Sequence, residues 1–201
     1  MAVYIRENSK LRWVDNSYKS DLLHSVKYPS FKSIKHLEGK GNFAVSKYYK
    51  WPFRPFYRHK LKMIVDMIGD DKFQRILDFG SGSGIFRQEL LRHAKSVSCI
   101  DIDTTINPHW RFDAIICASV LEFTHLYPTV DTLYNLLSPG GVLYVASPMD
   151  TKLSRAYYKL IKDDNYRHSH KTIKSVLEAK FNIKEHKEWM GLYFALKAFK
   201  R

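Results

Sequence analysis

The residues that offer the most specific chemistry are an acid and three glycines in the run Ile76-Leu77-Asp78-Phe79-Gly80-Ser81-Gly82-Ser83-Gly84. A short apolar stretch ends at the acid, and the glycines then occupy every second position. Glycine permits positive φ angles and allows a ligand to approach bare backbone. A helical apolar pattern follows, and a helix start carries N–H groups without intrahelical partners. The run therefore predicts a strand, a tight turn and a helix that bind a nucleotide-like cofactor.

The spacing of the glycines separates this turn from two common nucleotide loops. The dinucleotide fingerprint Gly-x-Gly-x-x-Gly needs a glycine where this chain has Ile85. A phosphate-binding loop needs Gly-Lys-Ser/Thr after its glycines, and that sequence is absent. The spacing acid-x-Gly-x-Gly-x-Gly instead resembles the first motif of the class I S-adenosylmethionine-dependent methyltransferases, which Asp78, Gly80, Gly82 and Gly84 match without a gap.

Three further segments match that family in the same order. Val97–Asp103 is an apolar run ending in acids, and Asp101 lies seventeen residues after Gly84, close to the spacing of about twenty at which an acid meets a ribose. Phe112–Glu122 resembles the family's next strand and its Val-Leu-Glu-His turn, although Phe123 replaces the histidine and His125 follows two places later. Leu137–Gly141 resembles the family's Leu-x-Pro-Gly-Gly turn. The resemblance covers roughly 56–201 and is closest to the small-molecule branch.

The resemblance implies a Rossmann-like α/β fold with a doubly wound, mostly parallel sheet and an antiparallel C-terminal hairpin. Hydrophobic patterns and turn residues predict helices at 56–68, 83–95, 128–137 and 170–180, and strands at 75–79, 96–101, 114–118, 142–147, 181–188 and 191–199. Only eleven residues separate Asp101 from Asp113, where the family places a helix and a third strand. A crossover connection alone needs about ten to twelve residues, so that helix and strand are predicted to be shortened or missing.

The chain divides into two parts. Residues 1–55 form a basic, aromatic N-terminal extension, interpreted as a lid on the substrate side, and residues 1–50 are expected to hold short helices and loops. Residues 56–201 form the cofactor-binding domain, and 148–167 form a roof over the substrate site. The aromatic and cationic run 48–58 either stacks on nucleic-acid bases or packs on the domain, and packing is preferred.

Charge and composition narrow the class of partners. The net charge is +13, and residues 1–60 carry 13 Lys/Arg against 4 Asp/Glu, whereas the remainder carries 20 against 16. Such a field favours anionic partners, or serves only solubility. No apolar run is long enough to span a membrane. Cys99 and Cys117 both lie in predicted strands, so we do not expect a disulfide framework. A cytoplasmic location is expected instead.

The resemblance implies S-adenosylmethionine as the cofactor and S-adenosylhomocysteine as the product. The residues expected to bind the cofactor lie at the ends of three predicted strands: Asp78, Phe79, Gly80, Ser81, Gly82, Gly84, Asp101, Ile102, Asp103, Ala118 and Ser119. In place of the acid that the family often has after its third strand, Asn107, His109 or Trp110 is expected to cover the adenine. No His/Cys cluster has metal-ligand spacing, and no metal is expected.

Methyl transfer from a sulfonium is a direct displacement, which requires in-line positioning and exclusion of water. A general base is needed only for an acceptor of high pKa, and the candidates are His125, Glu122 and His168. The expected acceptor is a small or amphipathic, possibly anionic or lipid-like molecule. A nucleic-acid methyltransferase is the alternative, although Ala118-Ser119-Val120-Leu121 stands where amino-group enzymes carry Asp/Asn-Pro-Pro-Tyr/Phe. A non-catalytic binding protein on the same fold is the second alternative, and the sequence does not indicate an oligomeric state.

Overall fold

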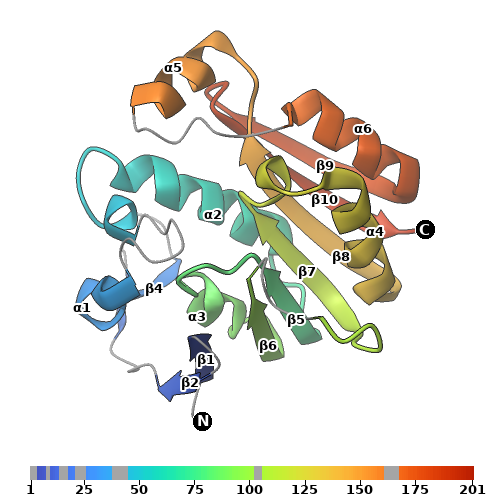
Figure 1. Ribbon diagram of the computed structural model, residues 1–201, viewed down its shortest axis with the longest axis horizontal. Coiled ribbons are helices and arrows are strands. Elements are labelled where there is room, and N and C mark those ends of the chain that lie inside the picture. The colour runs from blue at the N-terminus through green and yellow to red at the C-terminus, as the bar shows by residue number, and fades with distance from the viewer. Residues whose placement is uncertain are drawn as a thin grey trace.

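The computed structural model describes residues 4–7, 10–13, 18–20, 26–37, 45–101, 106–160 and 168–201 (Figure 1). Its main element is a six-stranded sheet of order β6-β5-β7-β8-β10-β9. These strands are β5 (Phe73–Phe79), β6 (Ala94–Ile100), β7 (Phe112–Ala118), β8 (Leu137–Pro148), β9 (Phe181–Trp189) and β10 (Tyr193–Lys200). The first four strands pair in parallel, and β10 is antiparallel to both β8 and β9. The predicted α/β fold and its antiparallel C-terminal hairpin are therefore confirmed.

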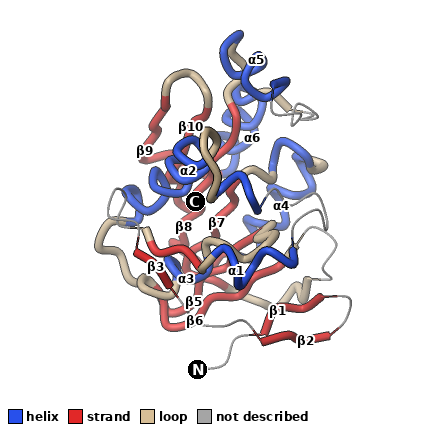
Figure 2. Tube along the Cα trace, turned by 90° about the vertical axis from the view of Figure 1, so that its left-hand side faces the viewer, coloured by secondary structure: helices blue, strands red, loops and turns tan. Residues whose placement is uncertain are grey.

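Helices cover both faces of the sheet. The longer ones are α2 (Arg54–Ile68), α4 (Leu126–Leu136), α5 (Lys152–Leu160) and α6 (His170–Lys180). Helix α2 lies on one face, whereas α4 and α6 lie side by side on the other (Figures 1 and 2). Within the described residues, no helix is both long and apolar enough to cross a membrane.

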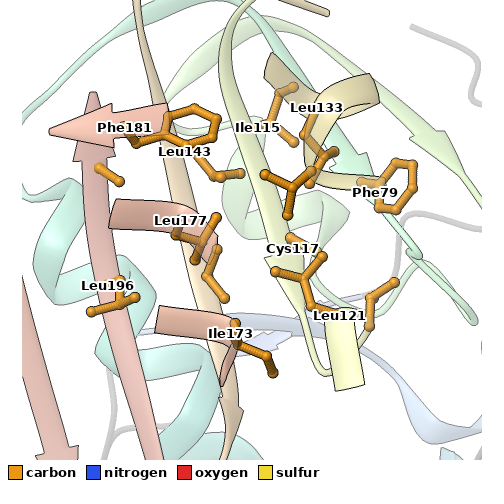
Figure 3. Packing of buried hydrophobic residues seen from close by; sticks show 14 of the residues in the cluster. Phe79, Ile115, Cys117, Leu121, Leu133, Leu143, Ile173, Leu177, Phe181 and Leu196 are labelled. Carbon is orange, nitrogen blue, oxygen red and sulfur yellow. The ribbon is translucent and has the colours of Figure 1, made fainter. Parts of the chain in front are cut away.

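The strands divide their apolar side chains between two cores because successive residues of a strand point to opposite faces. Ile116 and Tyr144 face α2, whereas their neighbours Cys117 and Leu143 face α4 and α6. Figure 3 shows the second core, in which Leu133 of α4 and Leu177 of α6 pack on strand residues. Both faces of the central strands are thus buried, which explains why their sequences are continuous apolar runs.

The predicted loss of the third strand agrees with the structure. In the described part of the chain, β6 is the edge strand of the sheet, and residues 106–111 form neither helix nor strand. Eleven residues separate the end of β6 from the start of β7, and β7 lies on the other side of β5.

Two predicted elements have boundaries that are wrong by four or five residues, whereas the other boundaries agree to within two. The helix expected at 83–95 is reduced to α3 (Arg87–Leu90), because turns occupy 82–86 and β6 already begins at Ala94. Gly84 has φ +67°, which is not helical, and the His93 carbonyl accepts from Phe73 N–H at 2.8 Å, so pairing with β5 forces the chain to extend there. Strand β8 begins at Leu137 instead of 142, because Leu137 already pairs with Phe112.

The N-terminal part also differs from expectation, since short strand pairs accompany its helices and loops. Strands β1 (Tyr4–Glu7) and β2 (Lys10–Trp13) pair, as do β3 (Tyr18–Ser20) and β4 (Lys27–Pro29), and α1 (Phe31–Ile34), η1 (Lys35–Leu37) and η3 (Val45–Tyr48) follow. Strands of three or four residues carry too little alternation for a pattern to predict them.

The aromatic and cationic run before α2 is used for packing. The Arg58 guanidinium lies 4.3 Å from the Tyr28 ring centre and 5.2 Å from that of Tyr49, and its Nε donates to Tyr48 O at 2.8 Å. The Tyr49 hydroxyl donates to Pro29 O at 2.6 Å. These contacts fasten residues 26–29 to α2 and agree with the preferred interpretation of this run.

Candidate functional site

The strand order places one point of the sheet where a ligand is expected. From β5 the chain continues to β6 on one side, and then to β7 on the other. In open α/β sheets, ligands bind outside the carboxyl ends of the strands at such a switch point. The glycine turn after β5, Asp101 after β6 and Ser119 after β7 all lie at this edge.

Next to the glycine turn, one oxygen of an acid and one nitrogen of an arginine are buried without hydrogen-bond partners. Asp78 is 4% exposed, and its Oδ2 has no hydrogen-bond partner. Burial, aided by the nearby charge of Asp101 and opposed by Arg87, raises the pKa of Asp78 to about 7. The Nη1 atom of Arg87 is also buried without a partner. Buried polar atoms left unpaired in a native structure need an explanation, and a polar ligand that pairs with them is one.

The glycine turn is fixed to the neighbouring strand. Both Gly80 N–H and Ser81 N–H donate to Ile100 O, at 2.8 and 3.0 Å, which holds the turn beside Asp101. The N–H groups of Gly82 and Ser83 donate to no carbonyl within the described ranges, so they remain available to a ligand.

Gly80 serves a packing requirement as well as a conformational one. Its φ is +71°, and a Cβ built on it would lie 2.2 Å from Val120 Cγ2. The loop after β7 therefore approaches the backbone after β5 more closely than any side chain would allow. This contact joins the turns after the two strands that flank the switch point.

The residues expected to bind the ribose and adenine are described in part. Asp101 is half-buried at the end of β6, close enough to Asp78 to affect its pKa, whereas Ile102 and Asp103 lie outside the described residues. Among the residues expected to cover the adenine, Asn107 and His109 are exposed. The backbone N–H of His109 donates a hydrogen bond to Asn107 Oδ1 at 2.9 Å. Trp110 is half-buried and packs edge-on against Phe112.

A buried polar cluster lies at the carboxyl ends of β7 and β8, next to the glycine turn. We call Lys60, Ser119, Glu122 and Ser147 the polar cluster. Lys60 Nζ donates to Ser119 Oγ at 2.6 Å, and Ser147 Oγ donates to Glu122 Oε2 at 2.8 Å. Lys60 is 5% exposed and Glu122 is 1% exposed. The sequence brings these residues together from α2, the turn after β7, the following 3-10 turn η4 (Leu121–Phe123) and β8.

The electrostatics of the polar cluster centre on Glu122. Burial raises its pKa to about 7, against the opposing effects of hydrogen bonds from its own backbone N–H and from Ser147 and of the positive charge of Lys60. Its second oxygen, Oε1, is buried without a hydrogen-bond partner. Ser119, beside Ala118 at the end of β7, has φ +58°, a conformation that a non-glycine residue adopts only where the surroundings impose it. The cluster thus holds a carboxyl group that exchanges its proton near neutral pH and has one unpaired oxygen.

The two candidate histidines occupy different positions. His125 is exposed and precedes α4, where its side chain makes no capping hydrogen bond. His168 is half-buried, and its Nε2 lies 2.9 Å from Thr124 O, which ties the start of the last described segment to the loop after β7. Within the described residues, neither histidine is hydrogen-bonded to a residue of the polar cluster. In the same residues no three potential metal ligands gather.

Three residues of this edge were not predicted from the sequence: Lys60, Arg87 and Ser147. A signal for Lys60 exists, since it lies four residues before Ile64 and so on the apolar stripe of α2. A lysine on a stripe that faces a core needs a buried partner. Arg87 and Ser147 carry no such signal, because arginine after a turn and serine at a strand end are ordinary surface residues.

Comparisons with known proteins agree with this geometry. A family model described as a methyltransferase domain matches residues 53–180. The N-methyltransferase NodS from Bradyrhizobium japonicum WM9, solved with S-adenosyl-L-homocysteine, has 16% identity and a TM-score of 0.60 over 83% of this chain and 97% of its own. A SAM-dependent methyltransferase from Aquifex aeolicus has 15% identity and a TM-score of 0.55, over 72% and 93%. A search of curated proteins finds no match.

One similar structure belongs to a protein named for a different reaction, so the fold alone does not identify a reaction. The [4+2]-cyclase SpnF has 14% identity and a TM-score of 0.56 over 71% of this chain and 80% of its own. At such identities a structural likeness shows the fold alone. The chemistry of this chain must therefore be argued from its own side chains.

Proposed function

The chain belongs to the S-adenosylmethionine-dependent methyltransferases, and on that premise we propose that it methylates a small or amphipathic acceptor bound next to the polar cluster. The observation that carries the proposal is the unpaired Oε1 of Glu122, buried at the carboxyl end of the strand beside β5.

The residues around the glycine turn fit the cofactor. Its amino-acid portion carries an ammonium and a carboxylate, and the unpaired Asp78 Oδ2 and Arg87 Nη1 supply an acceptor and a donor for such groups. The free N–H groups of Gly82 and Ser83 add donors. Asp101, half-buried after β6, supplies an acceptor for ribose hydroxyls. When bound, the cofactor supplies a methyl group on a positively charged sulfur, so the leaving group is already activated.

The polar cluster then acts on the acceptor. A carboxyl with a pKa of about 7 takes a proton from a bound hydroxyl or amine at neutral pH. The burial of Glu122 and the exposure of His125 support Glu122 in this role. Lys60 opposes the protonation of Glu122 through its charge and orients Ser119. The residues that follow Lys60 in α2 and precede Ser147 in β8, Leu61 and Ala146, are buried in the apolar core, which limits the access of water to this cluster.

The segments that flank this edge also suit a small acceptor. Tyr157 of α5 contacts Phe56 of α2, with ring centres 5.0 Å apart. This contact joins the predicted roof to α2 of the cofactor-binding domain. Residues 161–167 of the roof lie outside the described residues. A roof held against α2 beside this edge favours a molecule of limited size over a nucleic-acid duplex.

The experiment is transfer of labelled methyl from the cofactor to phenol, amine and carboxylate acceptors, and to RNA as a separate arm. We expect label in a low-molecular-mass acceptor, and Glu122→Gln is expected to lower kcat while leaving the Kd of S-adenosylhomocysteine unchanged. Label transferred to RNA alone would overturn the proposal. An equal loss of cofactor binding in Glu122→Gln would remove Glu122 from the acceptor side.

A further inference from the structure

Helix α5 presents an outward face that is exposed in the described part of the chain. Its inner side is fixed, since Ser154 Oγ donates to Leu192 O at 3.1 Å and Tyr158 is buried. On the outer side, Leu153 is 55% exposed, and Lys152 and Lys159 are exposed. The helix holds three cations and no acid. At 100° per residue, Leu153 and Ala156 form an apolar flank, and Lys152, Arg155 and Lys159 form a cationic one. Arg155 Nε donates to Asp150 Oδ1 at 2.6 Å, so the two lysines supply the net positive charge of this flank.

A second exposed apolar residue lies at the same end of the molecule. Met190, in the turn between β9 and β10, is 64% exposed. Thr151 Oγ1 donates to Gly191 O at 2.6 Å, so this turn lies against the start of α5. Figures 1 and 2 both show α5 and this turn together at one end, beyond the carboxyl edge of the sheet.

We propose that α5 and the β9–β10 turn dock on an anionic membrane surface. A helix with an apolar flank beside a cationic flank inserts its apolar side chains among headgroups while its lysines attract acidic lipids. The net charge of +13 also attracts the protein to an anionic surface at longer range. Ser147, the last-but-one residue of β8, belongs to the polar cluster, and α5 begins four residues after β8 ends. The docked face therefore adjoins the site. The proposal goes beyond the reaction and does not rest on it.

A nucleic acid is disfavoured as the occupant of this face. Bases stack on exposed aromatic rings, whereas the aromatic residues of α5 turn inward, with Tyr158 buried and Tyr157 against Phe56. The outward residues are aliphatic and cationic instead. Aliphatic side chains among lysines suit acyl chains below a layer of phosphates.

The experiment measures sedimentation of the full chain with vesicles of phosphatidylcholine containing phosphatidylserine, against phosphatidylcholine alone. We expect binding to the anionic vesicles only. Because each lysine near an anionic surface contributes about fivefold in partitioning, Lys152→Glu with Lys159→Glu is expected to lower the partition coefficient by about 25-fold or more. Leu153→Glu is also expected to lower the partition coefficient, although it adds only one negative charge.

The matched control carries the same charge change at the opposite edge of the sheet. Lys72 and Lys95 are exposed before β5 and at the start of β6, so Lys72→Glu with Lys95→Glu tests bulk charge alone. Equal loss of binding in this control, or no loss in Leu153→Glu, would overturn the proposal. Thermal unfolding of each variant establishes that it is folded, which exposed positions permit.

A fluorescent label reports the face directly. A polarity-sensitive dye on Leu153→Cys is expected to shift to the blue on addition of anionic vesicles, whereas the same dye on Lys72→Cys is not. A blue shift on concentrating the protein without vesicles would identify a second copy as the occupant and overturn the membrane proposal. Binding to single-stranded RNA without binding to vesicles would overturn it as well.

Discussion

The Lys60 ammonium donates to the Ser119 hydroxyl over 2.6 Å, and this bond joins α2 to the turn after β7. Lys60 is one of the few nearly buried cations in the described residues, and its charge also acts on Glu122. A helix that precedes the sheet thereby contributes to the polar environment at the carboxyl ends of the strands.

Replacing Lys60 with methionine keeps the aliphatic stem and removes this charge. We expect kcat to fall by about 30-fold, the equivalent of a charge-assisted hydrogen bond of about 2 kcal/mol, while cofactor affinity is unchanged. Lys62→Met, two residues along the same helix and paired with Asp66 on its surface, is the control. Steady-state kinetics and calorimetry check both, and parallel losses of cofactor affinity and turnover would place Lys60 in a merely structural role.

Gly80→Ala is expected to destabilise the fold more than Gly140→Ala does. The two glycines have nearly equal φ, +71° and +70°, but a Cβ at Gly80 meets Val120 at 2.2 Å, whereas nothing lies within 4 Å at Gly140. Each alanine substitution costs about 1–2 kcal/mol of stability because of the positive φ. Gly80→Ala costs about 1–3 kcal/mol more because its Cβ overpacks the contact with Val120. Urea unfolding measures the difference. Combining Gly80→Ala with Val120→Ala should recover part of it, and equal losses in the two single variants would contradict the close contact.

The pKa of Glu122 makes stability depend on pH. Its ordinary value is 4.5, and burial raises it to about 7 in the folded protein. Between these values the folded state holds a proton that the unfolded state has lost, so stability falls as the pH rises, by about 1.4 kcal/mol per pH unit. Asp78 acts in the same direction from 3.8 to about 7. Glu122→Gln should therefore flatten the decline in unfolding free energy across this window, and an unaltered slope would show that the carboxyl is already ionised.

The sequence predicts the parts of this molecule that periodicity and turn chemistry control. The apolar runs that become β5, β6 and β7, the glycine turn and the two C-terminal strands follow from the residues, whereas the antiparallel pairing of those two strands follows from the resemblance to the family. The helix predicted at 83–95 fails because Gly84 and the pairing of β6 override an apolar pattern that suits a helix. Lys60 and Ser147 meet Glu122 only through tertiary packing, which no local spacing encodes.

A separate test concerns how the N-terminal segment is attached. Glu89 is fully buried, its Oε2 accepts from Lys27 N–H at 2.6 Å, and Arg92 Nη1 donates to its Oε1 at 2.9 Å. Burial favours the neutral acid, but these hydrogen bonds, the charge of Arg92 and the His93 ring, whose Nε2 lies 3.4 Å from Oε1, outweigh it and lower the pKa of Glu89.

Glu89→Gln is expected to cost about 1.5–3 kcal/mol of stability and to speed amide exchange at 26–29. Since the folded pKa is depressed, wild-type stability from this group is lost as the pH falls through that folded value, and the variant should lack this acid dependence. Hydrogen exchange by mass spectrometry measures it. Unchanged exchange at 26–29 would show that other contacts hold the segment.

The most direct test of the central claim, that Asp101 and the glycine turn bind the cofactor, is calorimetric titration of S-adenosylhomocysteine into wild type and Asp101→Ala. Loss of charge-assisted bonds to the ribose is expected to weaken binding by about 10- to 100-fold. Glu178→Ala, an exposed acid on α6, should bind like wild type. Equal affinities for wild type and Asp101→Ala, or no binding to the wild type, would contradict the account.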